Sequence, residues 1–139
     1  MEIEGRAVAI TGVGGFIGRR VAALARARGA RVRGIDLDAA AADGAAEDGV
    51  DARPGDVTDP ASAAWLTRGA DVVVHAAAVV KEAGPMPRFE AVNVGGTRTV
   101  AAAAREAGVA RFVHLSSVMV YGFDFPDGVE EEGPYPCTE

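Results

Sequence analysis

Short apolar runs alternate with stretches of helical periodicity along most of the chain. Each run contains the β-branched residues that strands favour. The run DVVVH is unbroken, which is typical of a parallel strand buried on both faces. The predicted strands are residues 8–10, 31–36, 50–53, 71–75 and 111–116.

Three segments between these strands are predicted to be helices. The first starts near residue 17 and stops at Gly29, which suits a C-terminal cap, and its spaced apolar residues are Ile17, Val21, Leu24 and Ala25. The second starts at Pro60 and runs to residue 66, with Thr58 or Asp59 as its N-cap. The third covers residues 87–107 and stops at Gly108; one side of it carries Phe89, Val92, Gly96, Val100 and Ala103.

The remaining segments are less regular. Residues 39–49 are rich in alanine with scattered acids and are predicted to be a loose helix or a loop. The strands and helices alternate, which predicts right-handed crossovers and a parallel sheet covered on both faces. We therefore expect one α/β domain over residues 1–123, followed by an acidic loop or tail at residues 124–139.

Composition narrows the class of protein. The 139 residues suit a single domain, and 49% apolar with 24% charged residues is ordinary for a globular protein. No run reaches the roughly 18 apolar residues that span a bilayer, and the N-terminus lacks a basic leader region. Cys137 is the chain's one cysteine. These features predict a cytoplasmic protein without a disulfide, a cysteine metal cluster or a membrane partner.

Charge is unevenly distributed along the chain. The formal net charge is −6, and residues 124–139 hold six acids and no base. Residues 1–123 are therefore formally neutral and lack the basic surface that nucleic-acid binding requires. We expect no nucleic-acid partner, and the acidic stretch is interpreted as a solvated loop.

Three glycines spaced three residues apart, Gly12, Gly15 and Gly18, follow the first predicted strand in AVAITGVGGFIG. In a strand–turn–helix unit, Gly12 permits the tight turn, Gly15 lets the backbone approach a pyrophosphate, and Gly18 lets the helix pack close to the sheet. The N–H groups at the helix start then hold the anion. A glycine-rich turn without a ligand is the alternative interpretation. A phosphate-loop NTPase is disfavoured because no Gly-Lys-Ser/Thr follows.

An acidic residue at the end of the second strand supports a dinucleotide. Asp36 lies 18 residues after Gly18, where a ribose-binding acid is expected. Its carboxylate would repel a 2′-phosphate, and Leu37 and Asp38 follow it rather than an arginine. The sequence therefore predicts NAD rather than NADP, in a Rossmann-type doubly wound fold.

TGVGGFIG resembles the cofactor loop of the extended short-chain dehydrogenase/reductase family, the NAD-dependent epimerase/dehydratase type. Further segments agree in order: GDVTD at 55–59 resembles the adenine-contacting loop, HAAA at 75–78 the small-residue turn after strand four, NVGGT at 93–97 a helix segment, and SSVMVYG at 116–122 the end of strand five. The resemblance implies one catalytic residue, Ser117, which would hydrogen-bond the substrate oxygen. The predicted cofactor-binding residues are Gly12, Gly15, Phe16, Ile17, Gly18, Asp36, Asp56, Val57, Ala76, Ala77, Ala78 and Asn93.

The family's Tyr-x-x-x-Lys pair is absent from this sequence. Tyr121 is followed four residues later by Phe125, Tyr135 is followed by Glu139, and Lys81 is the chain's one lysine. The five predicted strands are also fewer than the family's six. We therefore expect the N-terminal part of a longer enzyme, which by itself binds NAD weakly, catalyses nothing and exposes apolar surface.

Two kinds of function remain open. The first is the NAD-binding portion of a nucleotide-sugar epimerase or dehydratase, with oxidoreductases of steroid-like or other alcohols as an alternative within the same family. The second is a module that senses NAD or acts as a scaffold without turnover. The resemblance also makes a homodimer through the helix at residues 88–107 possible.

Overall fold

The computed structural model describes residues 2–80, 86–122 and 128. The strands are β1 (Ala7–Thr11), β2 (Arg31–Asp36), β3 (Asp51–Pro54), β4 (Val72–His75) and β5 (Arg111–His114). The helices are α1 (Phe16–Ala27), α2 (Ala39–Glu47), α3 (Pro60–Thr67), α4 (Met86–Phe89) and α5 (Thr97–Glu106), with a π-helical segment η1 (Glu90–Gly96) between α4 and α5 and a 3₁₀ turn η2 (Val118–Tyr121) after β5.

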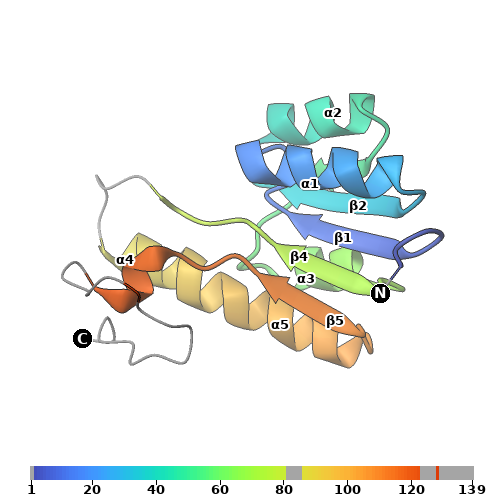
Figure 1. Cartoon of the computed structure of the whole chain (residues 1–139). Coiled ribbons are helices and arrows are strands. Elements are labelled where there is room, and N and C mark those ends of the chain that lie inside the picture. Colours follow the sequence, from blue (N-terminus) through green and yellow to red (C-terminus); the bar gives the residue numbers. More distant parts are fainter. Residues whose placement is uncertain (1, 81–85, 123–127, 129–139) are drawn as a thin grey trace.

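The five strands form one parallel sheet in the order β3-β2-β1-β4-β5. All arrows point toward the end of the molecule at which α4 lies (Figure 1). The chain extends the sheet outward from β1 to β3 and then returns to place β4 on the other side of β1. This reversal creates a crevice at the carboxyl ends of β1 and β4, where open α/β sheets bind ligands. The predicted fold class is confirmed.

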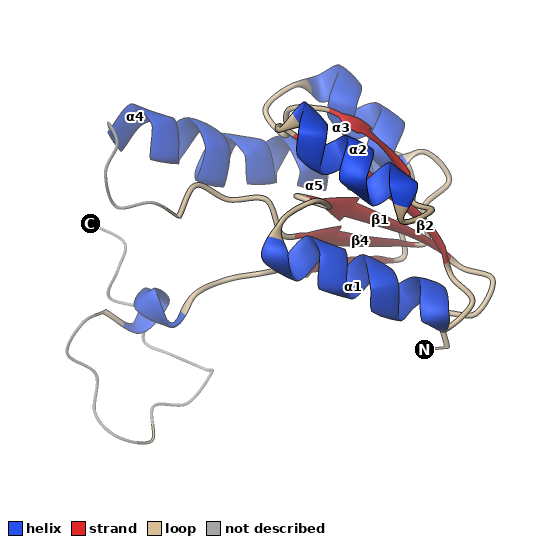
Figure 2. Ribbon diagram, turned by 90° about the horizontal axis from the view of Figure 1, so that it is seen from above, coloured by secondary structure: helices blue, strands red, loops and turns tan. Residues whose placement is uncertain are grey.

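Alternation of side chains along β1 divides the core into two layers. Val8 and Ile10 pack in a cluster with residues of α1 and α2, whereas Ala9 packs on the opposite face in a cluster with residues of α3 and α5. Successive strand residues point to opposite faces, so a short apolar run supplies both layers. Figure 2 shows α1 on one side of the strands and α5 on the other.

The buried face of α1 agrees only in part with the predicted spacing, because Ala25 is buried and Val21 packs against the core. Gly18, Ala22 and Ala25 are buried, while Ile17 and Leu24 are 49% and 40% exposed. The smallest side chains face the sheet because the helix packs close to the glycine turn that precedes it. Apolar spacing therefore located the helix, but two of the four spaced residues, Ile17 and Leu24, do not belong to its buried face.

The predicted continuous helix at residues 87–107 is interrupted. Residues 90–96 form a π-helix, whose wider turn changes the facing of the residues on either side. At Gly96 a Cβ would come within 2.6 Å of Val57 Cγ2. The absence of a side chain there lets this segment pack against the loop after β3.

The structure resolves the uncertain N-cap of α3 and the uncertain state of residues 39–49. Asp59 caps α3 by accepting hydrogen bonds from the N–H groups of Ala61 and Ser62 at 3.2 and 2.9 Å. The segment predicted as a loose helix or a loop is a helix, α2, capped by Asp38. Asp and Pro at these helix starts satisfy or remove N–H groups that would otherwise lack partners.

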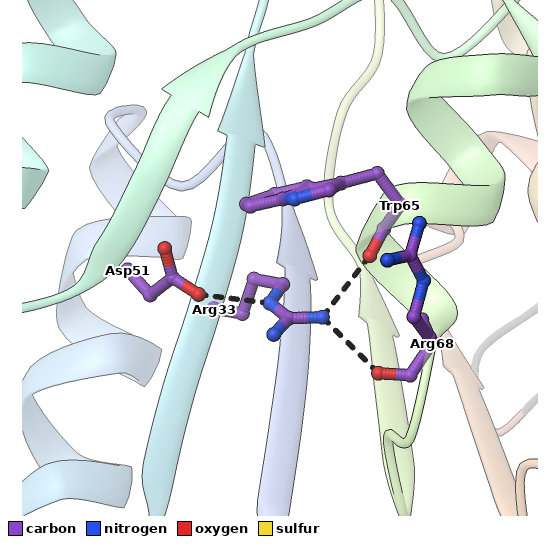
Figure 3. A network of polar contacts seen from close by, with 4 residues as sticks. All are labelled: Arg33, Asp51, Trp65 and Arg68. Atoms are coloured by element: carbon purple, nitrogen blue, oxygen red, sulfur yellow. Dashed lines mark hydrogen bonds and ion pairs between the residues drawn. The ribbon is translucent and has the colours of Figure 1, made fainter.

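One arginine joins three elements on the face opposite α1 (Figure 3). Arg33 of β2 donates to Asp51 of β3 at 3.0 Å, and its Nη1 donates to the carbonyl oxygens of Trp65 and Arg68 at the end of α3, both at 3.1 Å. The guanidinium carbons of Arg33 and Arg53 lie 4.8 and 3.9 Å from the Trp65 ring centroid. These contacts hold α3 to the edge of the sheet.

Two further expectations concern the acidic tail and a membrane-spanning helix. The predicted acidic tail, apart from Gly128, lies outside the described residues. Within residues 2–80, 86–122 and 128, no helix combines the length and apolar character needed to cross a bilayer. The division into residues 1–123 and 124–139 stays a prediction.

Candidate functional site

The loop between β1 and α1 brings bare backbone to the crevice. Gly12 has a φ of +65°, and a Cβ there would lie 3.1 Å from the Ala77 nitrogen. Gly15 is the N-cap of α1 and supplies no side chain to accept from the first-turn N–H groups. Those donors, at the positive end of the helix dipole, are therefore available to an anion.

The carboxylate of Asp36 lies against this loop. Its Oδ2 accepts a hydrogen bond from Gly14 N at 3.0 Å, and Oδ1 accepts one from Asp38 N at 3.1 Å. A carboxylate has about four acceptor positions, so two bonds leave capacity for hydroxyl donors. Leu37 beside it is 66% exposed. The side chain is thus fixed in orientation at the lip of the crevice.

The loop after β3 adds a second acid. Asp56 Oδ1 accepts from both the backbone N–H and the hydroxyl of Thr58, each at 2.8 Å, which leaves the other oxygen without a bond from this turn. Val57 is buried and packs in the cluster shared by α3 and α5. The aspartate therefore faces the crevice from a rigid support.

The residues after β4 form the opposite wall. The N–H groups of Ala76 and Ala77 donate to the Thr11 hydroxyl at 3.0 and 3.1 Å, so the wall is tied to the end of β1. Their small side chains leave the crevice open beside the glycine loop. Asn93 of η1 holds the far end of this wall, because its amide accepts from Val79 N at 2.8 Å and donates to Val79 O at 3.0 Å.

Together these segments enclose a cleft of about 470 Å³. Eight predicted residues line it: Gly12, Gly15, Asp36, Asp56, Val57, Ala76, Ala77 and Ala78. The cleft also includes an arginine, Arg88 of α4, which sequence reasoning did not assign to the site. Neither periodicity nor spacing signals Arg88, since α4 reaches the cleft only through the chain's return past β4.

The other predicted residues lie outside the cleft lining. Phe16 and Ile17 occupy the exposed first turn of α1, and Gly18 is buried beneath them. Asn93 contacts the cleft wall rather than the cleft. Ser117 is exposed and caps η2, accepting from Met119 N at 3.2 Å. Cofactor contact by these residues, and catalysis by Ser117, stay predictions.

Apolar residues complete the lining. Ile35 and Leu37 flank Asp36, and Val79, Val80 and Val92 extend the wall beyond the alanines. Val80 is 83% exposed. A cleft with apolar walls, two carboxylates, an arginine and a helix start can take a long ligand that carries hydroxyls, a ring and a diphosphate.

His75 lies under the wall, buried to 1% exposure at the end of β4. Burial, and to a smaller extent the neighbouring His114, lowers its pKa from 6.5 to about 4. Its ring is stacked on that of His114, with centroids 5.5 Å apart. The imidazole is therefore neutral at pH 7, in keeping with a structural residue rather than an acid or base.

The fold and cleft define a Rossmann-type dinucleotide-binding protein. The chain belongs to the NAD dependent epimerase/dehydratase family, whose model matches residues 8–139. NAD is the cofactor of that family, as the sequence predicted. The residues present fit the cofactor, since a Cβ at Gly12 would fill the space against Ala77 and Asp36 stands where ribose hydroxyls need an acceptor.

Several characterised proteins are similar to this chain. A 3 beta-hydroxysteroid dehydrogenase/Delta 5-->4-isomerase of Mycobacterium tuberculosis is 35% identical over 136 residues, covering 92% of this chain and 36% of that protein. A 4-hydroxy-2-methyl-3-oxo-4-farnesyl-3,4-dihydroquinoline-1-oxide ketoreductase of Stigmatella aurantiaca is 34% identical, covering 91% and 38%. The chain therefore spans little more than a third of the length of these relatives.

Solved structures agree with the fold. A short-chain dehydrogenase/reductase superfamily protein from Agrobacterium tumefaciens with bound NAD superposes with a TM-score of 0.76 at 34% identity, covering 93% of this chain and 38% of that one. A UDP-glucose-4-epimerase from Stenotrophomonas maltophila with bound NAD gives 0.79 at 26% identity, covering 94% and 42%. Both matches use most of this chain and less than half of the other protein.

Proposed function

We propose that these residues form the NAD-binding portion of an enzyme that transfers hydride at a carbinol or carbonyl carbon of a small molecule. The observation that carries this proposal is that the glycine loop, Asp36, Asp56 and the alanine wall all line the same cleft. When bound, NAD+ would accept hydride from a carbinol carbon, and its reduced form NADH would donate hydride to a carbonyl carbon. The chain's own residues would hold it: the first-turn N–H groups of α1 and Arg88 would bind the diphosphate, and Asp36 would accept hydrogen bonds from a ribose.

The substrate class has two candidates. A nucleotide sugar is the first, supported by the SSVMVYG segment and by the similarity to a UDP-glucose-4-epimerase. A steroid-like or other apolar alcohol is the second, supported by the higher identity to the hydroxysteroid dehydrogenase and the ketoreductase. In both cases Ser117 is the proposed partner of the substrate oxygen.

These 139 residues alone are proposed to bind without turnover. The sequence holds no Tyr-x-x-x-Lys pair to move the proton. A sensing or scaffold module is the competing function, and it is supported by the same absence. The coding sequence around this segment separates the two: a Tyr-x-x-x-Lys after residue 139 favours an enzyme, and a stop codon at 140 favours the module.

Calorimetry tests the binding proposal directly. We expect NAD and ADP-ribose to bind, and NADP to bind at least about tenfold more weakly because Asp36 repels its 2′-phosphate. Asp43→Ala removes an exposed acid on α2 and serves as the charge control for substitutions of Asp36. Absence of heat with all three ligands would refute the proposal, and equal affinity for NAD and NADP would refute the role of Asp36.

A further inference from the structure

A continuous chain of hydrogen bonds runs beneath the alanine wall of the cleft. Thr11 at the end of β1 contacts His75 at the end of β4, with Oγ1 and Nδ1 2.8 Å apart. On its other side His75 contacts Thr97 at the start of α5, with Nε2 and Oγ1 3.0 Å apart. The hydroxyl of Thr97 donates to the carbonyl oxygen of Asn93 at 2.6 Å. Four elements, β1, β4, η1 and α5, and the wall are thereby connected.

The direction of each bond follows from the donors present. Backbone N–H groups can only donate, so the two bonds from Ala76 and Ala77 use both lone pairs of Thr11 Oγ1. The hydroxyl hydrogen of Thr11 then has to point at His75 Nδ1, which must be unprotonated. The ring proton is therefore on Nε2, where it is donated to Thr97. Only the neutral imidazole with its proton on Nε2 satisfies every donor and acceptor in this series of hydrogen bonds.

Both ends of the alanine wall depend on this series of hydrogen bonds. Thr11 holds its first two residues, and Asn93 holds Val79 through a pair of hydrogen bonds. Thr97 fixes the backbone of Asn93 within the π-helical turn. Since Ala77 packs on Gly12 at the point where a Cβ would touch it, the position of the wall also sets the width of the cleft beside the glycine loop.

We propose that His75, as the neutral tautomer with its proton on Nε2, is a positioning residue that sets the alanine wall of the dinucleotide cleft through Thr11 on one side and Thr97 on the other. The part of this inference that concerns ligand affinity rests on the proposed NAD binding. The tautomer and its effect on the wall do not. His75 contacts neither the cleft nor a reacting atom, so it acts through the groups that it orients.

Packing alone would not require this arrangement. The groups facing the ring are the Thr11 hydroxyl from β1, the Phe112 and His114 rings from β5, and the Thr97 hydroxyl from α5. An apolar residue of similar size could fill the same space between them. It would leave both hydroxyls without their partner, and buried polar groups that lose a partner are costly.

The tautomer can be measured on the unmodified chain. Nitrogen-15 NMR of the imidazoles should show His75 with a protonated Nε2 and an unprotonated Nδ1 at neutral pH. The chain has two histidines, so His114→Gln assigns the signals. A protonated Nδ1, or an imidazolium at pH 7, would overturn the proposal.

Thr97 provides the matched variants, because it does not line the cleft. Thr97→Val removes the hydroxyl at nearly constant shape, and Thr97→Ser keeps it. Thr97→Val loses the hydrogen bonds to both His75 and Asn93. We expect it to shift the amide signals of Ala76, Ala77 and Val79 and to weaken NAD binding roughly fivefold. Binding of AMP, which Asp36 and Asp56 are proposed to hold, should change much less. Thr97→Ser should restore both properties.

The outcomes separate the two proposals. Unchanged wall signals in folded Thr97→Val would refute the positioning role, as would an equal loss of NAD and AMP affinity. If the wild-type tautomer and the wall shifts appear as expected but neither NAD nor AMP binds, the proposed function fails and the structural role of His75 stands. Circular dichroism of each variant establishes that it is folded.

Discussion

The α-carbon of Gly18 lies directly against the carbonyl oxygen of Gly12, so a Cβ at residue 18 would overlap that oxygen and would stand 2.9 Å from Val13 Cα. Backbone on both sides of this contact leaves no flexible side chain to move. The first and third glycines of the motif therefore work as a pair, in which one forms the turn and the other lets α1 rest on it.

Gly18→Ala should destabilise the fold by about 1 to 3 kcal/mol, because α1 has to move away from the glycine turn. The same shift should weaken NAD binding, since the first-turn N–H groups of α1 move with the helix. Urea unfolding and calorimetry measure the two effects. Gly44→Ala in α2 is the matched control, because a Cβ there has nothing within 4 Å and should stabilise by up to about 1 kcal/mol. A neutral Gly18→Ala would show that the close contact is unimportant.

Asp36→Ala combined with Leu37→Arg should change cofactor preference from NAD toward NADP. The first substitution removes the charge that repels a 2′-phosphate, and the second places a cation at an exposed position beside it. Competition between the two nucleotides in calorimetry measures the ratio. Leu37→Arg alone should give a smaller change because the carboxylate remains. A double variant that still prefers NAD by the original factor would contradict the assignment of Asp36.

Arg33→Lys should lower the free energy of unfolding by about 1 to 3 kcal/mol. A lysine cannot donate at once to Asp51, to the end of α3 and across the Trp65 ring, as the guanidinium does. Fluorescence of the chain's one tryptophan follows urea unfolding at this contact. Arg20→Ala on the exposed face of α1 should change stability by less than about 0.5 kcal/mol. A similarly small effect at Arg33 would show that the network is a solvated surface contact.

Stability should fall as pH falls through the range set by His75. Its pKa is 6.5 when unfolded and about 4 when folded, so the unfolded chain binds an extra proton between these values. The contribution of the neutral His75 to the free energy of unfolding is fully present above pH 6.5. It is lost as the pH falls to about 4, and the total loss is up to about 3 kcal/mol. Urea unfolding at about pH 7 and about pH 4.5 measures it.

Two controls isolate the histidine in that experiment. Hydrogen bonds from Ser62 and from Ala7 N–H hold the pKa values of Asp59 and Asp71 below 3.8, so their contributions are lost at lower pH. His114→Gln removes the exposed histidine and should keep most of the pH dependence. His75→Gln should remove it, and a dependence that survives in this variant would assign the effect to other groups.

The alternation of short apolar runs with helical segments was sufficient to predict the sheet, its parallel strands and both layers of helices. That signal is local. Core-facing residues recur at every second position of a strand and at about every fourth position of a helix, so the pattern can be read within one element. Gly12, Gly18 and Asp36 could be recognised for the same reason, since one strand, one turn and one helix place them. The cap at Asp59 was left between two neighbours, and geometry alone chose it.

Other features depended on contacts between distant segments. The π-helical turn, the small-residue face of α1 and the place of Arg88 follow from how elements separated in the chain pack, and no periodicity encodes that packing. The sequence by itself determined the family and the fold, and it predicted the acid that would hold a ribose. The tertiary structure decided how Thr11, His75, Thr97 and Asn93 meet, because a hydrogen bond across 64 residues forms only when two strands align side by side.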